Sequence, residues 1–220
     1  MAAITKRFSA SEELANALSH FIGALLASGG LTLMVVYSAV RGDAWHIVST
    51  AVFGTTMLVL YTSSTFNHAL QPGRGKEFFF NFDQVAIFLL IAGTYTPITL
   101  VLLRNGIGWT IFSLEWGLAI FGIVLKLLKP NRFESGVNYF FIALYALMGW
   151  MLLIGIGPIA RSISTMGLAW IFIGGGCYTL GILFYKSIRF PYHHLVWHLF
   201  VIAGSVSHFF AIFFHVIPAS

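Results

Sequence analysis

Charged side chains are scarce in this sequence, and cysteine is almost absent. Lys, Arg, Asp and Glu make up 9% of the 220 residues, whereas a soluble domain has about 25%. Hydrophobic residues reach 58%, so we predict an integral membrane protein. The net charge of +5 comes from residues in short loops, and it does not indicate nucleic-acid binding. The single cysteine, Cys177, excludes an intramolecular disulfide bond.

The sequence also lacks internal repeats, low-complexity tracts and any polar stretch long enough for a soluble domain. It contains seven apolar stretches of the length that crosses a bilayer as an α-helix, about 20 residues each. We therefore predict an all-α membrane protein, with a single seven-helix domain over residues 1–220. The predicted spans are Leu18–Val40, His46–Leu70, Phe78–Leu103, Trp109–Leu128, Tyr139–Ile156, Met166–Tyr185 and Tyr192–Val216.

The first apolar stretch is predicted to be a retained helix. Lys6 and Arg7 precede it, but no small-residue cleavage site follows it in the manner of a signal peptide. Turn and charge signals separate it from the next span, at Arg41-Gly-Asp43, and similar signals separate the later spans.

The basic residues predict the orientation, because cytoplasmic loops of membrane proteins are enriched in Lys and Arg. Nine of them fall on one side of the predicted topology and three on the other. We therefore expect a cytoplasmic N-terminus and an external C-terminus. The nine are Lys6, Arg7, Arg74, Lys76, Lys126, Lys129, Arg132, Lys186 and Arg189, and the three are Arg41, Arg104 and Arg161.

Two histidines lie four residues apart in Pro191-Tyr-His-His-Leu-Val-Trp-His198. If this segment is helical, His194 and His198 lie on one face, one turn apart, as in helices that present two nitrogens to one metal ion. A histidine within a membrane span is costly unless it is ligated or hydrogen-bonded. The pair alone also fits interfacial or core histidines with water and backbone partners, so it leaves both interpretations open.

Polar residues of two other spans fall at the same depth. The second span ends with Ser64 and His68, again one turn apart, and the third has Asp83 about two turns from its start. At a rise of about 1.5 Å per residue, these groups and the histidine pair lie roughly 5 to 15 Å inside the cytoplasmic boundary. This agreement in depth among three spans favours a common site.

Each of these residues has a simpler explanation when it is considered alone. The Asp83 carboxylate could pair with Lys76 or Arg74 at the interface. The Ser64 hydroxyl could bond a carbonyl of its own helix, as membrane serines often do. The His68 ring could lie unpaired among the lipid headgroups.

Together, His68, His194 and His198 form a three-histidine set with a carboxylate and a hydroxyl beside it. This composition suits Zn²⁺ with a fourth position open to water, the pattern of catalytic zinc sites. Asp83 would hold and deprotonate that water, or would orient a ligand. Ser64 would donate a hydrogen bond to the water or to a developing oxyanion.

A second polar cluster lies at the start of the first span. Glu13, Asn16 and His20 share one helical face, and Ser19 lies beside His20. Helix capping by Ser11, with acidic residues in the first turn, would explain the glutamates but not the deeper histidine. We therefore predict a polar network that packs under the metal site.

Two ionisable residues of the predicted spans remain outside these motifs. Glu115 shares no face with them and lies nearer the outer side, so its role is left unassigned. His208 follows His198 by ten residues on the last span, about 15 Å farther along a helix, which is too far for the same ion. We expect a hydrogen-bonded packing histidine there.

Six motifs follow one another along nearly the whole chain: Glu13-Leu-Ala-Asn16, Ser19-His20, Ser64-x3-His68, Phe82-Asp83, Ala92-Gly-Thr-Tyr-Thr-Pro97 and Pro191–His198. In this order and spacing, the sequence resembles the hemolysin III family, the bacterial relatives of the progestin and adipoQ receptors. The resemblance implies seven transmembrane helices, a cytoplasmic N-terminus and a zinc ion near the cytoplasmic face. It also implies that Ser64, His68, Asp83, His194 and His198 bear the site. The chain departs from the pattern at Asn67, where bacterial members commonly have tyrosine.

The resemblance further implies zinc-dependent hydrolysis of a lipid amide, with a membrane lipid as the substrate and a bacterial inner membrane as the location. In that mechanism Asp83 would be the general base and Ser64 the oxyanion helper. A lipid sensor or regulator with a structural zinc is the main alternative. A pore-forming hemolysin is ranked below both, since no predicted span has a continuous polar stripe.

Overall fold

The computed structural model of the protein describes residues 8–128, 139–186 and 190–217, and within these ranges it contains helices and no strands. Seven spans are long and apolar enough to cross a membrane, which confirms the predicted fold class. The elements are α1 (Ala10–Arg41), α2 (Ala44–Ala69), α3 (Arg74–Pro97), η1 (Ile98–Leu102), α4 (Gly106–Leu128), α5 (Tyr139–Gly149), η3 (Met151–Gly155), α6 (Ile156–Ser162), α7 (Thr165–Lys186) and α8 (His193–His215). Lys6, Arg7, Lys129, Arg132 and Arg189, on which part of the orientation prediction rests, lie outside the described residues.

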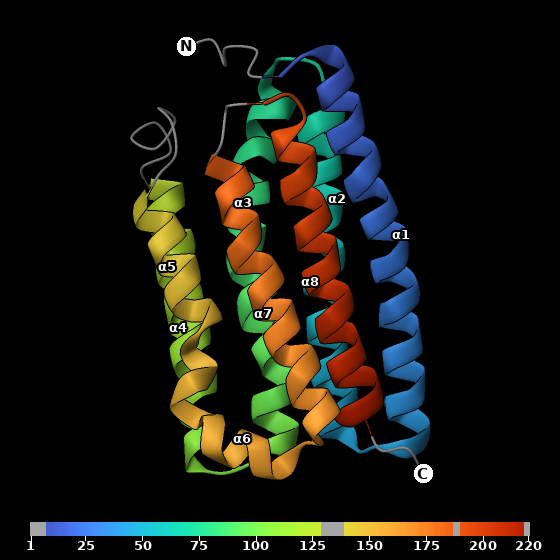
Figure 1. Ribbon diagram of the computed structural model, residues 1–220, viewed down its shortest axis with the longest axis vertical. Helices are drawn as coiled ribbons and strands as arrows, with labels where there is room; N and C mark the ends of the chain where they lie inside the picture. Colours follow the sequence, from blue (N-terminus) through green and yellow to red (C-terminus); the bar gives the residue numbers. More distant parts are fainter. Residues whose placement is uncertain (1–7, 129–138, 187–189, 218–220) are drawn as a thin grey trace.

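The helices form one elongated bundle with α3 at its centre (Figure 1). In the span formed by α3 and η1, 72% of the apolar window is buried, compared with 22% to 44% for the other six spans. Helices α1, α2 and α8 pack together on one side of it, and α4 and α5 lie on the other (Figure 1). The central helix therefore separates two groups of helices, each of which has its own buried polar groups.

The first helix begins earlier than the hydropathy pattern predicts, and Ser9 caps it instead of Ser11. The Ser9 side chain accepts from the Glu12 backbone N–H, and the Glu12 side chain accepts from the Ser9 N–H at 2.9 Å. This reciprocal pair is a capping box, which requires Glu or Gln three residues after the cap. Ser9 meets that requirement and Ser11, which is followed by Leu14, does not.

Two of the predicted continuous spans are interrupted. The third changes from α-helix to π-helix after Pro97, because proline has no N–H for the helical hydrogen-bond ladder. The fifth, predicted as Tyr139–Ile156, stops at Gly149, continues as the 3-10 helix η3, and ends in the short helix α6. In Figure 1, α6 runs across the end of the bundle instead of along it.

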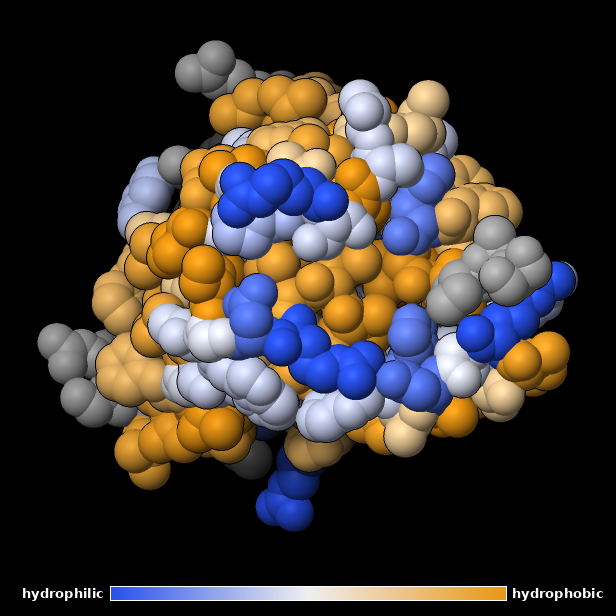
Figure 2. All heavy atoms as spheres, turned by 90° about the horizontal axis from the view of Figure 1, so that it is seen from below, coloured by the Kyte–Doolittle hydropathy of each residue, from blue (hydrophilic) through white to orange (hydrophobic). Residues whose placement is uncertain are grey.

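The end of the bundle that contains α6 also contains Arg41, Arg104 and Arg161, and we call it the arginine end. Figure 2 shows this face: polar side chains surround an apolar centre. Asp43 caps α2 here by accepting from the N–H groups of Trp45 and His46. The hydrogen bond from the His46 ring, the one from its backbone N–H and the nearby Arg104 guanidinium hold the pKa of Asp43 below its usual range.

Candidate metal centre

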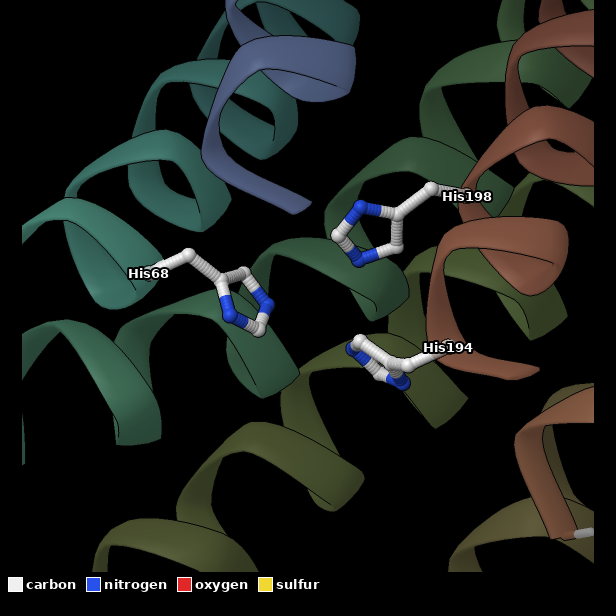
Figure 3. Close-up of side chains that lie close together, drawn as sticks. All are labelled: His68, His194 and His198. Atoms are coloured by element: carbon white, nitrogen blue, oxygen red, sulfur yellow. The ribbon is translucent and has the colours of Figure 1, made fainter. Parts of the chain in front are cut away.

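The three predicted histidine ligands come together at the opposite end of the bundle (Figure 3). His68 comes from the last turn of α2, and His194 and His198 come from the first two turns of α8. One nitrogen from each ring lies within 4.8 Å of the others. Among the described residues, this is the one group of three His, Cys, Asp or Glu side chains with such spacing. We call it the histidine site.

All three side chains are buried. Their exposed fractions are 6% for His68, 9% for His194 and 1% for His198. The ring centroids of His194 and His198 are 4.6 Å apart, and each lies 5.1 Å from that of His68. The Phe8 ring stacks against His194 at a centroid distance of 5.0 Å, so an aromatic side chain covers the site near the start of α1.

Glu13 of α1 fixes the orientation of the His68 ring. The distance from His68 Nδ1 to Glu13 Oε2 is 2.6 Å, and Lys76 Nζ donates to Glu13 Oε1 at 2.9 Å. Since a carboxylate beside an ammonium group accepts hydrogen bonds, Nδ1 is the donor, and the lone pair of the neutral imidazole is on Nε2. The Nε2 atom is buried and has no hydrogen-bond partner among the described residues.

Ser19 fixes the orientation of the His198 ring in the same way. The Ser19 hydroxyl donates to the Asn16 carbonyl at 2.8 Å, so its oxygen is left to accept from His198 Nδ1 at 3.0 Å. The lone pair of His198 is therefore also on Nε2. Two of the three rings are thus held in the same tautomer by polar groups of α1, an arrangement typical of metal-binding histidines.

Asp83 of α3 lies beside the histidine site and outside the group of ligand atoms. Its Oδ2 accepts from Asn67 Nδ2 at 3.1 Å, and it interacts electrostatically with His68. The suggested pairing with Lys76 is not formed, because Lys76 binds Glu13 and the Asn67 carbonyl instead. The departure from the family pattern at Asn67 therefore provides a donor to the carboxylate.

The Ser64 hydroxyl is buried next to Asp83. Its neighbour Ser63 bonds the Leu60 carbonyl of its own helix, whereas Ser64 makes no such bond. Ser64 therefore differs from most membrane serines, which bond a carbonyl of their own helix. The side chain is left to interact with groups in the site.

His20 and Asn16 complete the surroundings on the α1 side. The His20 ring stacks on His198 with a centroid distance of 3.5 Å and an interplanar angle of 13°. Both of its ring nitrogens, and both polar atoms of the Asn16 side chain, are buried without a hydrogen-bond partner among the described residues. The structure thus brings the predicted first-span cluster to the site.

Sequence analysis did not identify Lys76 as part of this arrangement. Lys76 follows the second span in a loop-like segment, where it indicates the orientation of the chain and offers one possible partner for Asp83. Its position in the first turn of α3 places the ammonium group within reach of α1 and α2. No local motif predicts this pairing, because Glu13 lies 63 residues from Lys76 in the chain.

The donor set fits a zinc ion. Zn²⁺ takes imidazole nitrogens at about 2.0–2.1 Å, which places tetrahedral ligand atoms about 3.3 Å apart. Ligand atoms already within 4.8 Å of one another need only small side-chain movements to reach that spacing. The unpartnered Nε2 of His68 is the kind of buried polar atom that such an ion would satisfy.

The other two singled-out residues lie elsewhere. His208 Nε2 donates to the Ile171 carbonyl at 3.2 Å, which is consistent with a packing role between α7 and α8. Glu115 of α4 is fully buried on the other side of α3. Neither belongs to the histidine site.

Fold and site together define a multi-pass membrane protein of seven helical spans with a buried three-histidine cluster near one end. The chain belongs to the haemolysin-III related family, whose model matches residues 8–209. This confirms the resemblance seen in the sequence motifs.

Individual relatives cover almost the entire chain. It is 39% identical over 208 residues to the hemolysin-3 homolog of Bacillus subtilis strain 168, a match that covers 94% of this chain and 96% of the relative. It is 36% identical over 209 residues to hemolysin-3 of Bacillus cereus, covering 95% and 94% respectively. The human monocyte to macrophage differentiation factor is 26% identical over 214 residues, covering 91% of this chain and 83% of the relative. No solved structure matches the chain.

Proposed function

We propose that this protein is a zinc-dependent hydrolase of lipid amides that acts in the cytoplasmic half of a bacterial inner membrane. The observation that supports this function best is the composition of the histidine site. Three buried imidazoles lie beside the Asp83 carboxylate and the Ser64 hydroxyl, and two of the imidazoles have oriented Nε2 lone pairs. Neither the carboxylate nor the hydroxyl is hydrogen-bonded within its own helix.

His68, His194 and His198 would hold the zinc ion. Bound Zn²⁺ supplies Lewis-acid chemistry, which polarises a substrate carbonyl. Glu13 and Ser19 keep the ligand rings in the neutral tautomer that offers Nε2. Because these supporting groups are on α1 and the ligands are on α2 and α8, the site depends on the packing of three helices.

Asp83 is the proposed general base. Asn67 occupies its Oδ2 atom, so the other carboxylate oxygen is left to accept the proton of an attacking water. The Ser64 hydroxyl, buried beside it, is placed to donate a hydrogen bond to the carbonyl oxygen as negative charge develops there. Together these residues match the needs of amide hydrolysis.

A lipid is the proposed substrate because the site lies inside an apolar bundle. The outer faces of the helices next to it expose large apolar side chains, including Leu14, Leu18 and Leu199. Such faces contact hydrocarbon, so a substrate with acyl chains reaches the site from the bilayer. The predicted orientation places this end of the bundle at the cytoplasmic side.

The test combines metal content with turnover. Purified wild type is compared with the double variant His194→Ala/His198→Ala and with Asp83→Asn, and His215→Ala serves as a control on the same helix. Fatty-acid release is measured from ceramide, an N-acyl ethanolamine and an N-acyl amino acid. We expect about one zinc per chain in wild type, Asp83→Asn and His215→Ala, and little in the double variant.

Turnover should fall by about 100-fold or more in Asp83→Asn, the usual contribution of a general base. Full activity in that variant would remove Asp83 from the mechanism. Stoichiometric zinc without hydrolysis of any of the three lipids would favour the second candidate function, a lipid sensor in which the metal braces α2 against α8. That alternative is supported by the ligands' position on two different helices, and it predicts a large drop in melting temperature on metal removal.

A further inference from the structure

Glu115 lies in the interior of the bundle with no partner for its charge. Its exposed fraction is 0%, and neither carboxyl oxygen has a hydrogen-bond partner among the described residues. It is in the middle of α4, two to three turns from the first residue of that helix, Gly106. An unpaired carboxylate at such a depth is costly, so the position needs an explanation.

The elements around Glu115 include an interrupted helix. Tyr95 of α3, with which Glu115 interacts electrostatically, bridges the break between α5 and η3. Its hydroxyl donates to the Gly149 carbonyl at 2.9 Å and accepts from the Leu152 N–H at 2.8 Å. The Tyr95 side chain thus replaces backbone hydrogen bonds that the broken helix does not make.

None of the described residues donates a hydrogen bond to Glu115. A tyrosine hydroxyl has one hydrogen, and that of Tyr95 is used by Gly149. Next to Glu115 in the chain, the Trp116 indole N–H donates to Thr96 Oγ1 at 3.2 Å. The Thr96 hydroxyl in turn donates to its own helix, to the Ala92 carbonyl at 2.9 Å.

The cost of burial is different for a protonated Glu115. A neutral carboxylic acid carries no charge, so burying it at this depth costs much less than burying a carboxylate. Tyr95 is the titratable side chain of the described residues with which Glu115 interacts electrostatically.

We propose that Glu115 is a proton-binding site inside the membrane domain, occupied at neutral pH and separate from the histidine site. The neutral acid interacts electrostatically with Tyr95, the residue that bridges the break in the fifth span. Release of the proton would place a negative charge beside that break without a donor to stabilise it. The site therefore links proton occupancy to the geometry of α5 and η3.

Infrared spectroscopy of the full-length protein in lipid nanodiscs tests the proposal directly. The spectrum of Glu115→Gln is subtracted from that of wild type at pH 7, in a buffer whose only cation is choline. A protonated site gives a carboxylic-acid carbonyl band in the difference, whereas an ionised site gives carboxylate bands. Glu77→Gln is the matched control, because Glu77 is a partly exposed glutamate near the helix start and should give carboxylate bands.

Carboxylate bands in the Glu115 difference would overturn the proposal. Conversion from acid to carboxylate bands on addition of Na⁺ or Li⁺ would also overturn it, in favour of a monovalent-cation site. If Glu115→Gln does not fold, wild type labelled with ¹³C-glutamate replaces the variant, and absence of an isotope-shifted acid band is the contradicting result. Zinc content of Glu115→Gln should equal that of wild type, which separates this test from that of the histidine site.

Discussion

Glu13 and His68 are joined by a 2.6 Å contact between a carboxylate oxygen and a ring nitrogen, although one is on α1 and the other on α2. The second oxygen of Glu13 binds Lys76 of α3, so a single carboxylate connects three helices. The contact determines which nitrogen of His68 faces the histidine site. A residue that binds no ion itself therefore controls the geometry of a ligand.

Replacing Glu13 should weaken metal binding without removing a ligand. In Glu13→Gln the ring of His68 loses its anionic acceptor, and such partners contribute about 10- to 100-fold to metal affinity. Zinc affinity, measured by competition with a chelator, should fall by that factor. Glu12→Gln, which changes an adjacent glutamate at the helix cap, should leave the affinity unchanged, and equal losses in the two variants would contradict the assignment.

Ser19→Ala is expected to have a smaller effect of the same kind. The hydroxyl accepts from His198 Nδ1, but the Asn16 carbonyl also interacts with this ring, so a partner remains. Zinc affinity should fall several-fold, by less than in Glu13→Gln. Ser28→Ala, on the exposed part of the same helix, is the control. A loss equal to that of a ligand variant would show that Ser19 does more than orient the ring.

The packing of α1 on α2 gives a prediction that is independent of the metal. A methyl group on Gly23 would lie 2.6 Å from Tyr61 Cδ1, whereas one on Gly29 would meet nothing within 4 Å. Gly23→Ala should therefore destabilise the protein by about 1–3 kcal/mol. Gly29→Ala should be neutral or slightly stabilising, because alanine favours helix. Thermal unfolding of both variants in the same detergent distinguishes them, and equal melting temperatures would argue against the close approach.

Tyr95→Phe tests the bridge across the break in the fifth span. The substitution leaves the Gly149 carbonyl and the Leu152 N–H without their partner inside the bundle. Loss of stability should be about 1–3 kcal/mol, the cost of buried polar groups left unsatisfied. Tyr37→Phe removes a hydroxyl from a lipid-facing tyrosine that is 38% exposed, and it should have little effect. Similar unfolding curves for the two variants would mean that the bridge does not stabilise the fold.

The arginine end should respond to acid through Asp43. Because its pKa is lowered in the folded state, its charge contributes stability above the unfolded pKa of about 3.9, and this contribution is lost as the pH falls through the folded value. Wild type should exceed Asp43→Asn in melting temperature at pH 6, with the difference narrowing below about pH 4. Since asparagine also caps helices well, a difference that is constant with pH would point to geometry instead of charge.

The sequence predicts the number of spans and the composition of the histidine site because both depend on local patterns. Long apolar runs identify the helices, and the four-residue spacing places His194 and His198 on one face. The break at Gly149 has no such local signal, since the groups that stabilise it belong to Tyr95, earlier in the chain by 54 residues. The pairing of Lys76 with Glu13 is likewise a result of tertiary packing. Glu115 could be recognised as unusual, but its neighbours could not be named.

The distribution of the histidine site along the chain has a consequence for biosynthesis. His68, its partner Glu13 and the Lys76 that binds Glu13 belong to the first three spans, whereas His194 and His198 belong to the last one. During synthesis, one ligand and its orienting carboxylate are therefore in the membrane long before the other two ligands leave the ribosome. A metal ion that requires all three histidines can be captured only after the final helix has inserted, so its uptake would mark the completion of the bundle.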